Sequence, residues 1–226
     1  MNLENAKKNS MEQQSREWHQ ARLGRFTGSE VYKLMTNPST KAAREAGELS
    51  KGAQTYVREQ VAEVLTGRAK DFSNFYTEWG NEYESEARFY YELESGNEVT
   101  LVGFIEYGEH GGGSPDGLIG EDGMIEIKCP FNQEKHLDYL LMESPDDLPK
   151  EYYWQIQNNL LVTGRKWCDF ISYHPHFTGD HRMRVLRVER SDEDCLLLAD
   201  RIHKAGKEKE VMLMKLGVFE TELQDA

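Results

Sequence analysis

Two short apolar segments that carry acidic side chains and a lysine constrain this chain more than any other feature. Residues 114–118 read Ser-Pro-Asp-Gly-Leu, and residues 125–128 read Ile-Glu-Ile-Lys. Between them, residues 120–123 read Gly-Glu-Asp-Gly, and Asp-Gly dipeptides supply the positive φ that tight hairpin turns need. The sequence therefore predicts two adjacent strands, with an acid on the first and an acid and a lysine on the second.

The alternation of side chains along the second strand separates its polar residues from its apolar ones. Glu126 and Lys128 are two residues apart, so they point to the same face of a strand. Ile125 and Ile127 point to the opposite face, where they can be buried. The hairpin brings Asp116 into the neighbourhood of Glu126 and Lys128, so the three side chains form a candidate site.

Two carboxylates and an ammonium on one side of a hairpin suit a divalent metal. Mg²⁺ takes oxygen ligands and keeps several waters for substrate phosphates to replace. A lysine beside the metal can hold hydroxide and neutralise developing charge. The alternative is a surface hairpin with an ordinary cross-strand salt bridge, but Pro115, Gly117 and the apolar setting favour the metal site.

Further blocks of sequence surround this hairpin in a recognisable order. Asp116 with Glu126-Ile-Lys128 resembles the signature of the PD-(D/E)xK nuclease superfamily. The whole series resembles the phage lambda exonuclease family, also called the YqaJ-type viral recombinase family. The matching blocks are Trp-His-Gln-Ala-Arg-Leu-Gly at 18–24, Thr-Gly-Ser-Glu at 27–30, Trp-Gly-Asn-Glu-Tyr-Glu at 79–84, Ser-Pro-Asp-Gly-Leu at 114–118, Glu-Ile-Lys-Cys-Pro at 126–130 and Tyr-Trp-Gln-Ile-Gln at 153–157.

The resemblance implies an α/β fold with a restriction-endonuclease-like core, in which helices flank a central mixed β-sheet. It also implies a Mg²⁺-dependent exonuclease that degrades one strand of linear double-stranded DNA from 5′ to 3′. The products would be 5′-mononucleotides and 3′ single-stranded tails for annealing recombination. The same resemblance implies two Mg²⁺ ions per site, for which Mn²⁺ can substitute. It also implies a homotrimeric ring around DNA and a phage-type single-strand annealing protein as partner.

The resemblance assigns roles to individual positions. The metal ligands it implies are Glu84, Asp116, Glu126 and the backbone carbonyl of Ile127. The catalytic residues it implies are Asp116, Glu126 and Lys128. The residues it implies for a pocket that holds the terminal 5′-phosphate are Arg22, Ser29, Ser114, Lys128 and Gln155. This last set is chemically suitable, because arginine offers a bidentate fork and serine and glutamine add neutral donors.

Length and composition agree with one domain spanning residues 1–226. The 226 residues are 38% hydrophobic and 30% charged, which is typical of a globular chain below the size at which domains split. No segment approaches the roughly 20 apolar residues of a membrane span. The polar first 14 residues lack the apolar segment of an export signal. The three cysteines are scattered and form no C-x-x-C pair, so we expect a cytoplasmic protein, and the resemblance implies that the cytoplasm is that of a bacterial host cell.

The net charge of −13 opposes binding to a polyanion unless it is unevenly distributed. The distribution is uneven, since residues 1–70 hold 12 Lys and Arg against 8 Asp and Glu, whereas residues 71–226 hold 15 against 32. One basic surface is therefore predicted, or alternatively these are ordinary solvated charges. The candidates for this surface are Arg22, Arg25, Lys33, Lys41, Arg44 and Lys51.

Periodicity and turn residues predict the order of the helices and strands. Helices are expected at 15–22, 30–35 with Ser29 as N-cap, 53–66 with Gly67 at the end, 75–94, 133–142, 150–163 and after Ser191. Strands are expected at 99–107, 114–119, 124–129, 167–173 and 183–188. The segment 37–50 is expected to be a loop, and Gly111–Gly113 a flexible turn. Tyr152, Tyr153 and Trp154 are expected to be core or interface residues.

Two other functions remain compatible with the sequence. The same acids and lysine can serve a sequence-specific or structure-specific DNA endonuclease, which would cut covalently closed circular DNA. The chain can also be a catalytically silent DNA-binding or adaptor module. The intact Asp116, Glu126 and Lys128 argue against a silent module, because such a module has no physical need for them.

Overall fold

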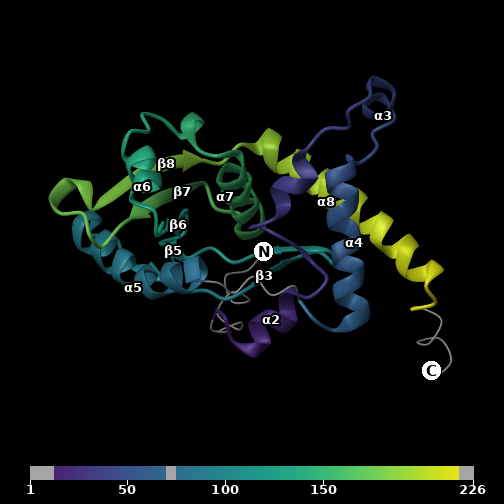
Figure 1. Ribbon diagram of the computed structural model, residues 1–226, viewed down its shortest axis with the longest axis horizontal. Helices are drawn as coiled ribbons and strands as arrows, with labels where there is room; N and C mark the ends of the chain where they lie inside the picture. The colour runs from purple at the N-terminus through teal and green to yellow at the C-terminus, as the bar shows by residue number, and fades with distance from the viewer. Residues whose placement is uncertain (1–12, 70–74, 219–226) are drawn as a thin grey trace.

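A mixed β-sheet lies between helices in the computed structural model, which describes residues 13–69 and 75–218 (Figure 1). The helices are α2 (Arg16–Arg22), α3 (Lys41–Glu45), α4 (Lys51–Thr66), α5 (Phe75–Ser95), α6 (Gln133–Leu140), α7 (Lys150–Thr163) and α8 (Asp192–Lys215), with the 3₁₀ helices η1 (Val31–Met35), η2 (Pro145–Asp147) and η3 (Gly179–His181). The strands are β1 (Phe26–Thr27), β2 (Val99–Thr100), β3 (Ile105–Tyr107), β4 (Gly111–Gly113), β5 (Gly117–Ile119), β6 (Gly123–Lys128), β7 (Trp167–Tyr173) and β8 (Met183–Glu189).

The larger sheet places the predicted hairpin at its centre. Its strand order is β2-β5-β6-β7-β8, and β6 pairs antiparallel with β5 and parallel with β7. The smaller sheet has the order β1-β4-β3. The pairing with β7 runs from Gly123 to Lys128, whereas the pairing with β5 ends at Ile125, so β7 is the strand that fixes the backbone of Glu126 and Lys128.

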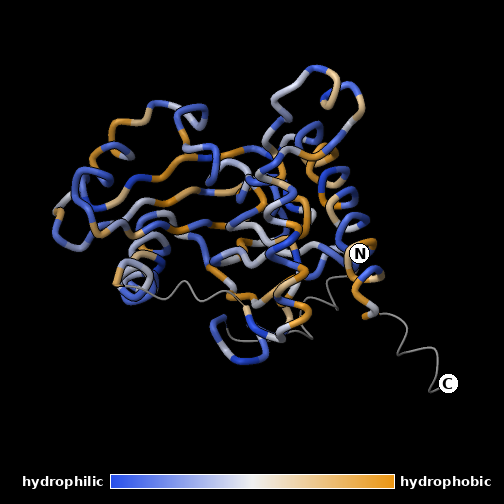
Figure 2. The backbone as a smooth tube through the Cα atoms, turned by 45° about the vertical axis from the view of Figure 1, so that its right-hand side comes forward, coloured by the Kyte–Doolittle hydropathy of each residue, from blue (hydrophilic) through white to orange (hydrophobic). Residues whose placement is uncertain are grey.

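The two faces of the larger sheet are covered by different helices, as the alternation in β6 predicted. Ile125 and Ile127 are buried with Ala87 and Tyr91 of α5. On the other face, Met124 belongs to an apolar cluster that includes residues of α6 and α7. The apolar stretches of the strands run between these helices (Figure 2).

A third apolar cluster joins the N-terminal part of the chain to the last helix. Phe26, Val31 and Tyr56 pack there with Leu198 and Ile202 of α8, and α4 and α8 lie side by side (Figure 1). This cluster holds β1 and its flanking residues beside the larger sheet.

Helix boundaries follow the capping residues in the sequence. Ser15 caps α2 by accepting from the amide of Trp18, and Ser191 caps α8 by accepting from the amide of Asp194. Gly67 and Gly164 take the left-handed conformation after α4 and α7, which only glycine adopts without strain. The helices predicted at 15–22, 53–66, 75–94, 133–142 and 150–163 and the final helix are confirmed.

Two local predictions in the N-terminal part are wrong. Ser29 is not a helix cap: the residue before η1 is Glu30, and no side chain caps that short 3₁₀ helix. The segment predicted as a loop at 37–50 contains α3, whose N-cap Thr40 accepts from the amide of Ala43. Propensity reasoning favoured a loop because Pro38 and Gly47 flank a helix of only five residues.

The predicted strand at 99–107 is in fact two strands in different sheets, since β2 pairs with β5 and β3 pairs with β4. Gly111–Gly113, predicted as a flexible turn, is the buried central strand of the smaller sheet. Its glycines make room for neighbours, because a Cβ at Gly112 would lie 2.0 Å from the ring of Phe104 and one at Gly113 would lie 2.3 Å from Oδ1 of Asn159.

The hairpin turn also differs in detail from its prediction. Its positive φ belongs to Gly120 (+48°), not to the Asp-Gly pair. Gly123 begins β6 and packs against Trp167, whose ring would lie 2.2 Å from an added Cβ.

The three cysteines are free and buried. Burial raises the pKa of Cys129 to about 12, so this thiol beside Lys128 stays protonated at neutral pH. Within residues 13–69 and 75–218, no helix combines the length and the apolar character needed to cross a membrane.

Substitution of Gly112 by alanine tests the packing of the smaller sheet. The added methyl group overlaps the buried Phe104 ring, and overpacking of this kind costs about 1–3 kcal/mol. We expect Gly112→Ala to lower the free energy of unfolding by this amount in urea denaturation. Gly80→Ala is the control, because its Cβ has no neighbour within 4 Å. Equal stability of the two variants would contradict the packing described for β4.

Candidate active site

The predicted catalytic, metal-binding and phosphate-binding residues all line one cavity of about 610 Å³. Its wall is built by side chains from α2, α5, α6 and α7 and by the β5–β6 hairpin. The predicted residues that line it are Arg22, Ser29, Glu84, Ser114, Asp116, Glu126, Ile127, Lys128 and Gln155. Positions that are up to 133 residues apart in the sequence are thus brought to one place, while the role of each remains a prediction.

Asp116 is held against the strand β6 by two hydrogen bonds. Its amide donates to the carbonyl of Ile125 (3.2 Å), and its Oδ2 accepts from the amide of Ile127 (2.6 Å). Burial, reinforced by the carboxylates of Glu126 and Glu84, raises the pKa of Asp116 well above its usual value. The side chain is therefore fixed in position in an environment with excess negative charge.

Glu126 is the most enclosed of the three acids, with 1% of its surface exposed. Its Oε1 accepts from Nζ of Lys128 (2.7 Å) and from Nε2 of Gln155 (2.5 Å). Its Oε2 accepts from Nδ2 of Asn159 (3.2 Å). Gln155 and Asn159 are four residues apart on α7, so one face of that helix satisfies both oxygens of the buried carboxylate.

Lys128 carries the positive charge of the hairpin. Burial lowers the pKa of this lysine, but the carboxylates of Glu126 and Asp116 outweigh that effect and raise it above the usual value. The ammonium group also donates to Oε1 of Gln155 (3.2 Å). Lys128 is therefore protonated at neutral pH and is suited to attract an anion, not to act as a base.

Glu84 contributes the third carboxylate from α5. Its Oε1 accepts from Nη1 of Arg88 (3.3 Å) one helical turn away. Burial raises its pKa, Arg88 opposes the shift, and the carboxylate of Glu126 adds to it. Burial is the main cause of the raised pKa values of Glu84 and Asp116, and the neighbouring carboxylates add to it despite the presence of Lys128 and Arg88. A hard divalent cation with oxygen ligands fits this donor set.

The three carboxylates do not yet form a closed ligand set. Among the described residues, ligand atoms within 4.8 Å of one another occur instead in Glu109, His110 and Glu210. Glu210 is already engaged there by His110 (3.1 Å) and Lys207 (3.0 Å). In the cavity, Glu126 accepts three hydrogen bonds from Lys128, Gln155 and Asn159, so metal binding there would require some of these side chains to exchange partners.

A second group of residues surrounds Arg22. Its guanidinium lies 4.0 Å from the centre of the Trp18 ring and donates to Oγ of Ser114 and Oγ1 of Thr27 (both 3.4 Å). Nε1 of Trp18 donates to the same Ser114 oxygen (2.9 Å). Burial lowers the pKa of Arg22 to about 10, which still leaves it charged at neutral pH.

Ser29 and Gln155 line the same cavity as Arg22. A Cβ at Gly28 would lie 3.6 Å from Cγ of Gln155, so the segment before Ser29 packs directly on α7. Gln155 in turn contacts both Glu126 and Lys128. The arginine region and the carboxylate region are therefore parts of one cavity.

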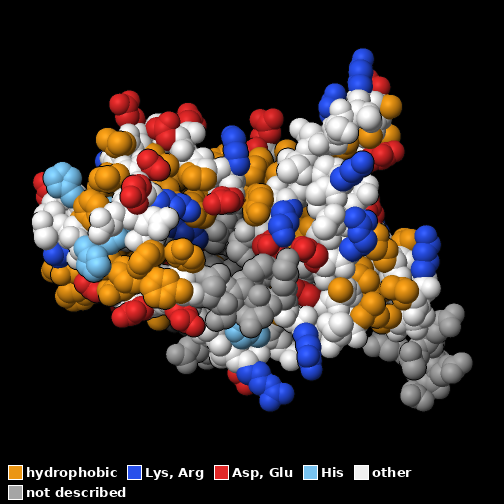
Figure 3. Space-filling view, viewed as in Figure 1, with side chains coloured by type: hydrophobic (Ala, Val, Ile, Leu, Met, Phe, Trp, Pro, Cys, Tyr) orange, Lys and Arg blue, Asp and Glu red, His pale blue; other side chains and the backbone are white. Residues whose placement is uncertain are grey.

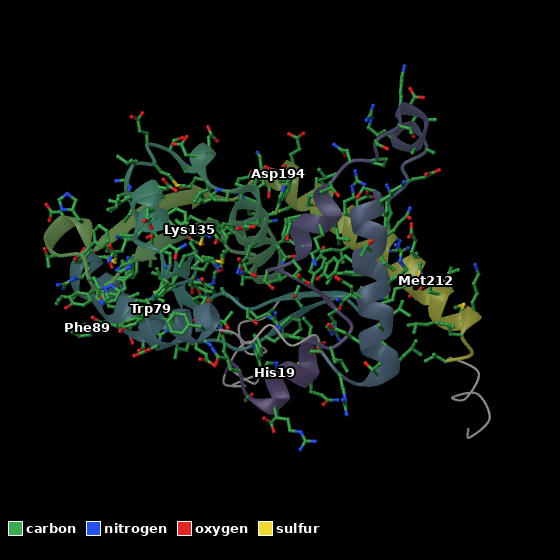
Figure 4. The ribbon with its side chains drawn as sticks, viewed as in Figure 1. His19, Trp79, Phe89, Lys135, Asp194 and Met212 are labelled. Carbon is green, nitrogen blue, oxygen red and sulfur yellow. The ribbon has the colours of Figure 1, made fainter. Side chains whose placement is uncertain are left out.

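One rim of the cavity is aromatic. Tyr76 and Phe131 line it, and their rings contact each other and Phe75 with centroids 4.9–5.9 Å apart. These side chains are 40–62% exposed, and apolar side chains gather over α5 in Figure 3. Trp79 of α5 (Figure 4) also contacts Phe131, with ring centroids 5.1 Å apart.

The predicted basic surface is only partly present. Arg25 pairs with Glu106, Lys33 with Glu30 and Glu59, and Lys41 with Glu45. Lys and Arg side chains appear as separate patches around α3 and α4, not as one continuous surface (Figure 3). Positive charge that faces the cavity comes instead from Arg22, Lys128 and Lys135.

Sequence reasoning missed several side chains that complete the cavity. Asn159 contacts Glu126, and its position four residues after Gln155 was the available signal. Trp18 was part of a matching block, but its contact with Ser114 spans 96 residues and no local pattern indicates it. Lys135 and Tyr152 also line the cavity, and Tyr152 packs against an apolar core cluster as well, as expected.

The sheet order and the acid–acid–lysine hairpin define a protein of the restriction-endonuclease-like α/β fold. The model of the YqaJ-like viral recombinase domain matches residues 17–166, and the chain belongs to this family. Family membership and the structures below support a nuclease that acts on DNA.

Solved structures share this fold over nearly the whole chain. The alkaline exonuclease LHK-Exo from Laribacter hongkongensis matches with a TM-score of 0.77 and 33% identity, covering 92% of this chain and all of that one. Its complex with dAMP matches with the same TM-score and 34% identity over the same shares of the two chains. A phage-related exonuclease from Haemophilus somnus 129PT has a TM-score of 0.73 at 20% identity, over 85% of this chain and 96% of that one.

One curated viral protein is also similar. The uncharacterized protein R354 of Acanthamoeba polyphaga mimivirus is 29% identical over 119 residues, which is 46% of this chain. The match covers 21% of R354, so this chain corresponds to about a fifth of that protein.

The raised pKa of Asp116 predicts that this carboxyl group lowers the stability of the metal-free protein. The folded state binds its proton more tightly than the unfolded state does, so stability falls as the pH rises above the unfolded-state pKa. Asp116→Asn removes this charge and can keep the contact with the Ile127 amide. We expect its metal-free melting temperature at pH 8 to exceed that of the wild type by roughly 2–4 °C.

The pH dependence provides the control for this experiment. The difference should shrink toward pH 4, where the wild-type carboxyl group becomes protonated. Added Mg²⁺ should raise the melting temperature of the wild type more than that of Asp116→Asn. A variant that is less stable than the wild type at pH 8 without metal would contradict the charge excess inferred for the cavity.

Proposed function

We propose that this protein is a Mg²⁺-dependent 5′-to-3′ exonuclease that degrades one strand of linear double-stranded DNA to 5′-mononucleotides. The observation that carries the proposal is the single cavity in which three carboxylates and Lys128 adjoin the Arg22 group. One part of the cavity suits a metal-assisted hydrolysis, and the other suits a terminal phosphate. The distance between them would set which phosphodiester bond is cut.

The carboxylates and the lysine would divide the work of hydrolysis. Glu84, Asp116 and Glu126, with the carbonyl of Ile127, would hold two divalent ions, which supply an activated water and stabilise the leaving 3′ oxygen. Lys128 would stay protonated beside the scissile phosphate and stabilise the charge that develops on its oxygens. Gln155 and Asn159 keep Glu126 in place from α7.

The Arg22 group would bind the 5′-phosphate. Trp18 and Thr27 hold the guanidinium in a fixed orientation, so little side-chain entropy is lost when the phosphate binds. Ser29, Ser114 and Gln155 would add neutral donors, and Lys128 would link the pocket to the metal site. A fixed terminal phosphate would present the next scissile bond to the metals after each cleavage.

The relatives support the chemistry of this proposal. LHK-Exo is called an alkaline exonuclease and has been crystallised with dAMP, a mononucleotide. Its identity to this chain is 33–34% over 92% of the chain. An exonuclease that releases mononucleotides needs a site that can hold a nucleoside monophosphate, its product.

We extend the proposal to the assembly. Three one-domain subunits would form a homotrimeric ring around DNA, with the cavity of each subunit facing a central channel. The 3′ tail would pass to a phage-type single-strand annealing protein in the cytoplasm of the host. The mass of the purified protein by light scattering tests the trimer. A monomer at the concentrations used for activity would reject it.

Removal of either hairpin acid should abolish cleavage. We expect Asp116→Ala and Glu126→Gln to reduce Mg²⁺-dependent digestion of end-labelled linear duplex by at least about a thousandfold, and Lys128→Ala to slow it about a hundredfold. Asp122→Ala is the matched control, because this exposed acid of the same hairpin contacts Lys166 instead of the cavity. Near-wild-type turnover by folded Asp116→Ala would reject the site.

The same assay separates the alternative functions. Covalently closed circular DNA should remain intact with the wild type, whereas an endonuclease of the same superfamily would cut it. A catalytically silent module would bind the linear duplex and leave it undigested at every Mg²⁺ or Mn²⁺ concentration.

The phosphate pocket predicts a preference among DNA ends. We expect linear duplex with a 5′-phosphate to be digested faster than duplex with a 5′-hydroxyl under single-turnover conditions. Arg22→Ala should slow digestion of phosphorylated ends by roughly tenfold or more, because a charge-assisted contact to phosphate contributes about 1.5–3 kcal/mol. It should also reduce the difference between the two ends. Arg58→Ala, an exposed arginine of α4, should change neither rate.

Equal wild-type rates on the two kinds of end would show that the Arg22 group does not bind the terminal phosphate. Loss of activity in Arg22→Ala with an unchanged preference for phosphate would place the arginine elsewhere in the mechanism.

A further inference from the structure

Two lysines of the cavity share one tyrosine. Nζ of Lys128 lies 5.0 Å from the centre of the Tyr152 ring, and Nζ of Lys135 lies 5.4 Å from it. Nζ of Lys135 also donates to the hydroxyl of Tyr152 (3.0 Å). The ring itself is fixed from behind, because it stacks on the buried Phe170 with centroids 5.9 Å apart.

Lys135 differs from Lys128 in its partners. Lys128 pairs with Glu126. Over residues 13–69 and 75–218, no carboxylate oxygen lies within 4.0 Å of the Lys135 ammonium. The side chain nevertheless lines the cavity from α6, between that helix and α7 (Figure 4). A hydroxyl and a ring orient its charge without neutralising it.

An oriented but unneutralised ammonium at a cavity wall is suited to bind an anion. Two ammonium groups beside one ring repel each other, and a phosphate between or beside them would relieve this repulsion. The π-face and the hydroxyl of Tyr152 interact favourably with both ammonium groups and carry no negative charge, so the two lysines stay available to an anion. A carboxylate in this position would have removed the attraction for DNA.

We propose that Lys135 binds a backbone phosphate of the DNA next to the scissile one, and that Tyr152 is the positioning residue for both Lys135 and Lys128. The proposal rests on the proposed function and adds a contact to the substrate from α6. Lys135 would contribute to DNA binding, and Lys128 to cleavage. Tyr152 would fix the spacing of these two charges along the DNA strand.

Equilibrium binding tests the role of Lys135 separately from catalysis. The probe is a fluorescein-labelled linear duplex with 5′-phosphates, measured by anisotropy in buffer with EDTA over a range of NaCl concentrations. We expect Lys135→Gln to raise Kd roughly fivefold at moderate salt and to reduce the slope of log K against log salt by about one. Lys135→Arg keeps the charge and should restore both values to within twofold of the wild type.

Lys150→Gln is the matched control. Lys150 also lies over a tyrosine ring, with Nζ 5.8 Å from the centre of the Tyr153 ring, but it is outside the described lining of the cavity. The same change of charge there should leave Kd and the salt dependence within twofold of the wild type.

Single-turnover cleavage with saturating duplex and Mg²⁺ separates the two lysines. Lys135→Gln should keep a saturating rate within twofold of the wild type. Tyr152→Phe keeps the ring but loses the hydroxyl, so it should weaken binding two- to threefold and leave the rate unchanged. Tyr152→Leu removes the ring beneath Lys128 as well, and should lower the saturating rate at least fivefold.

The outcomes separate this inference from the proposed function. If the wild type neither binds nor digests the duplex, the proposed function fails. If the wild type does both, but Lys135→Gln matches Lys150→Gln in Kd and salt dependence, the inference fails. A lower melting temperature in Lys135→Gln or Tyr152→Phe with an unchanged salt slope would make this pair a structural contact and would also overturn it.

Discussion

The buried carboxylate of Glu126 is the constraint on which the rest of the cavity depends. With 1% of its surface exposed, it cannot be hydrated, and an unpaired charge in that position would strongly destabilise the fold. Lys128 supplies the opposite charge from the same strand, and α7 supplies two amide donors. The packing of α7 on β6 is therefore both an apolar contact and a set of hydrogen bonds to one acid, which fixes the helix in register with the hairpin.

The features that could be predicted from the sequence are those that depend on residues close together in the chain. The hairpin, the faces of Glu126 and Ile127 and the ends of α7 depend on alternation, turn residues and a C-terminal glycine, all of which act within a few residues. The sequence mispredicted Gly111–Gly113, because the need for glycine there comes from Phe104 and Asn159 on other elements. The neighbourhood of Arg22 and Ser114 depends on contacts across more than 90 residues, and only the family resemblance brought those positions together.

The net charge of −13 is compatible with a DNA substrate once the location of the charges is considered. Arg25, Lys33 and Lys41 of the N-terminal part are paired with nearby acids, so they add little attraction. The cations that face the cavity are Arg22, Lys128 and Lys135. Arg22 and Lys128 are partly buried there, so their charges act more strongly than charges on a solvated surface do. Local arrangement, not the total charge, decides what the cavity attracts.

The helix α7 connects the separate parts of this chemistry. Tyr152, Gln155 and Asn159 follow one another at helical spacing of three and four residues, so they lie on one face, while Ile156 and Leu160 are buried in the apolar cores. That polar face touches Lys135, Lys128 and Glu126 in turn along its length. A rotation of α7 would move all these contacts together. The apolar residues of the helix thus hold the acids that we propose as metal ligands and the cations that we propose as phosphate ligands at a fixed spacing, which is the property that an enzyme acting on a repeating backbone requires.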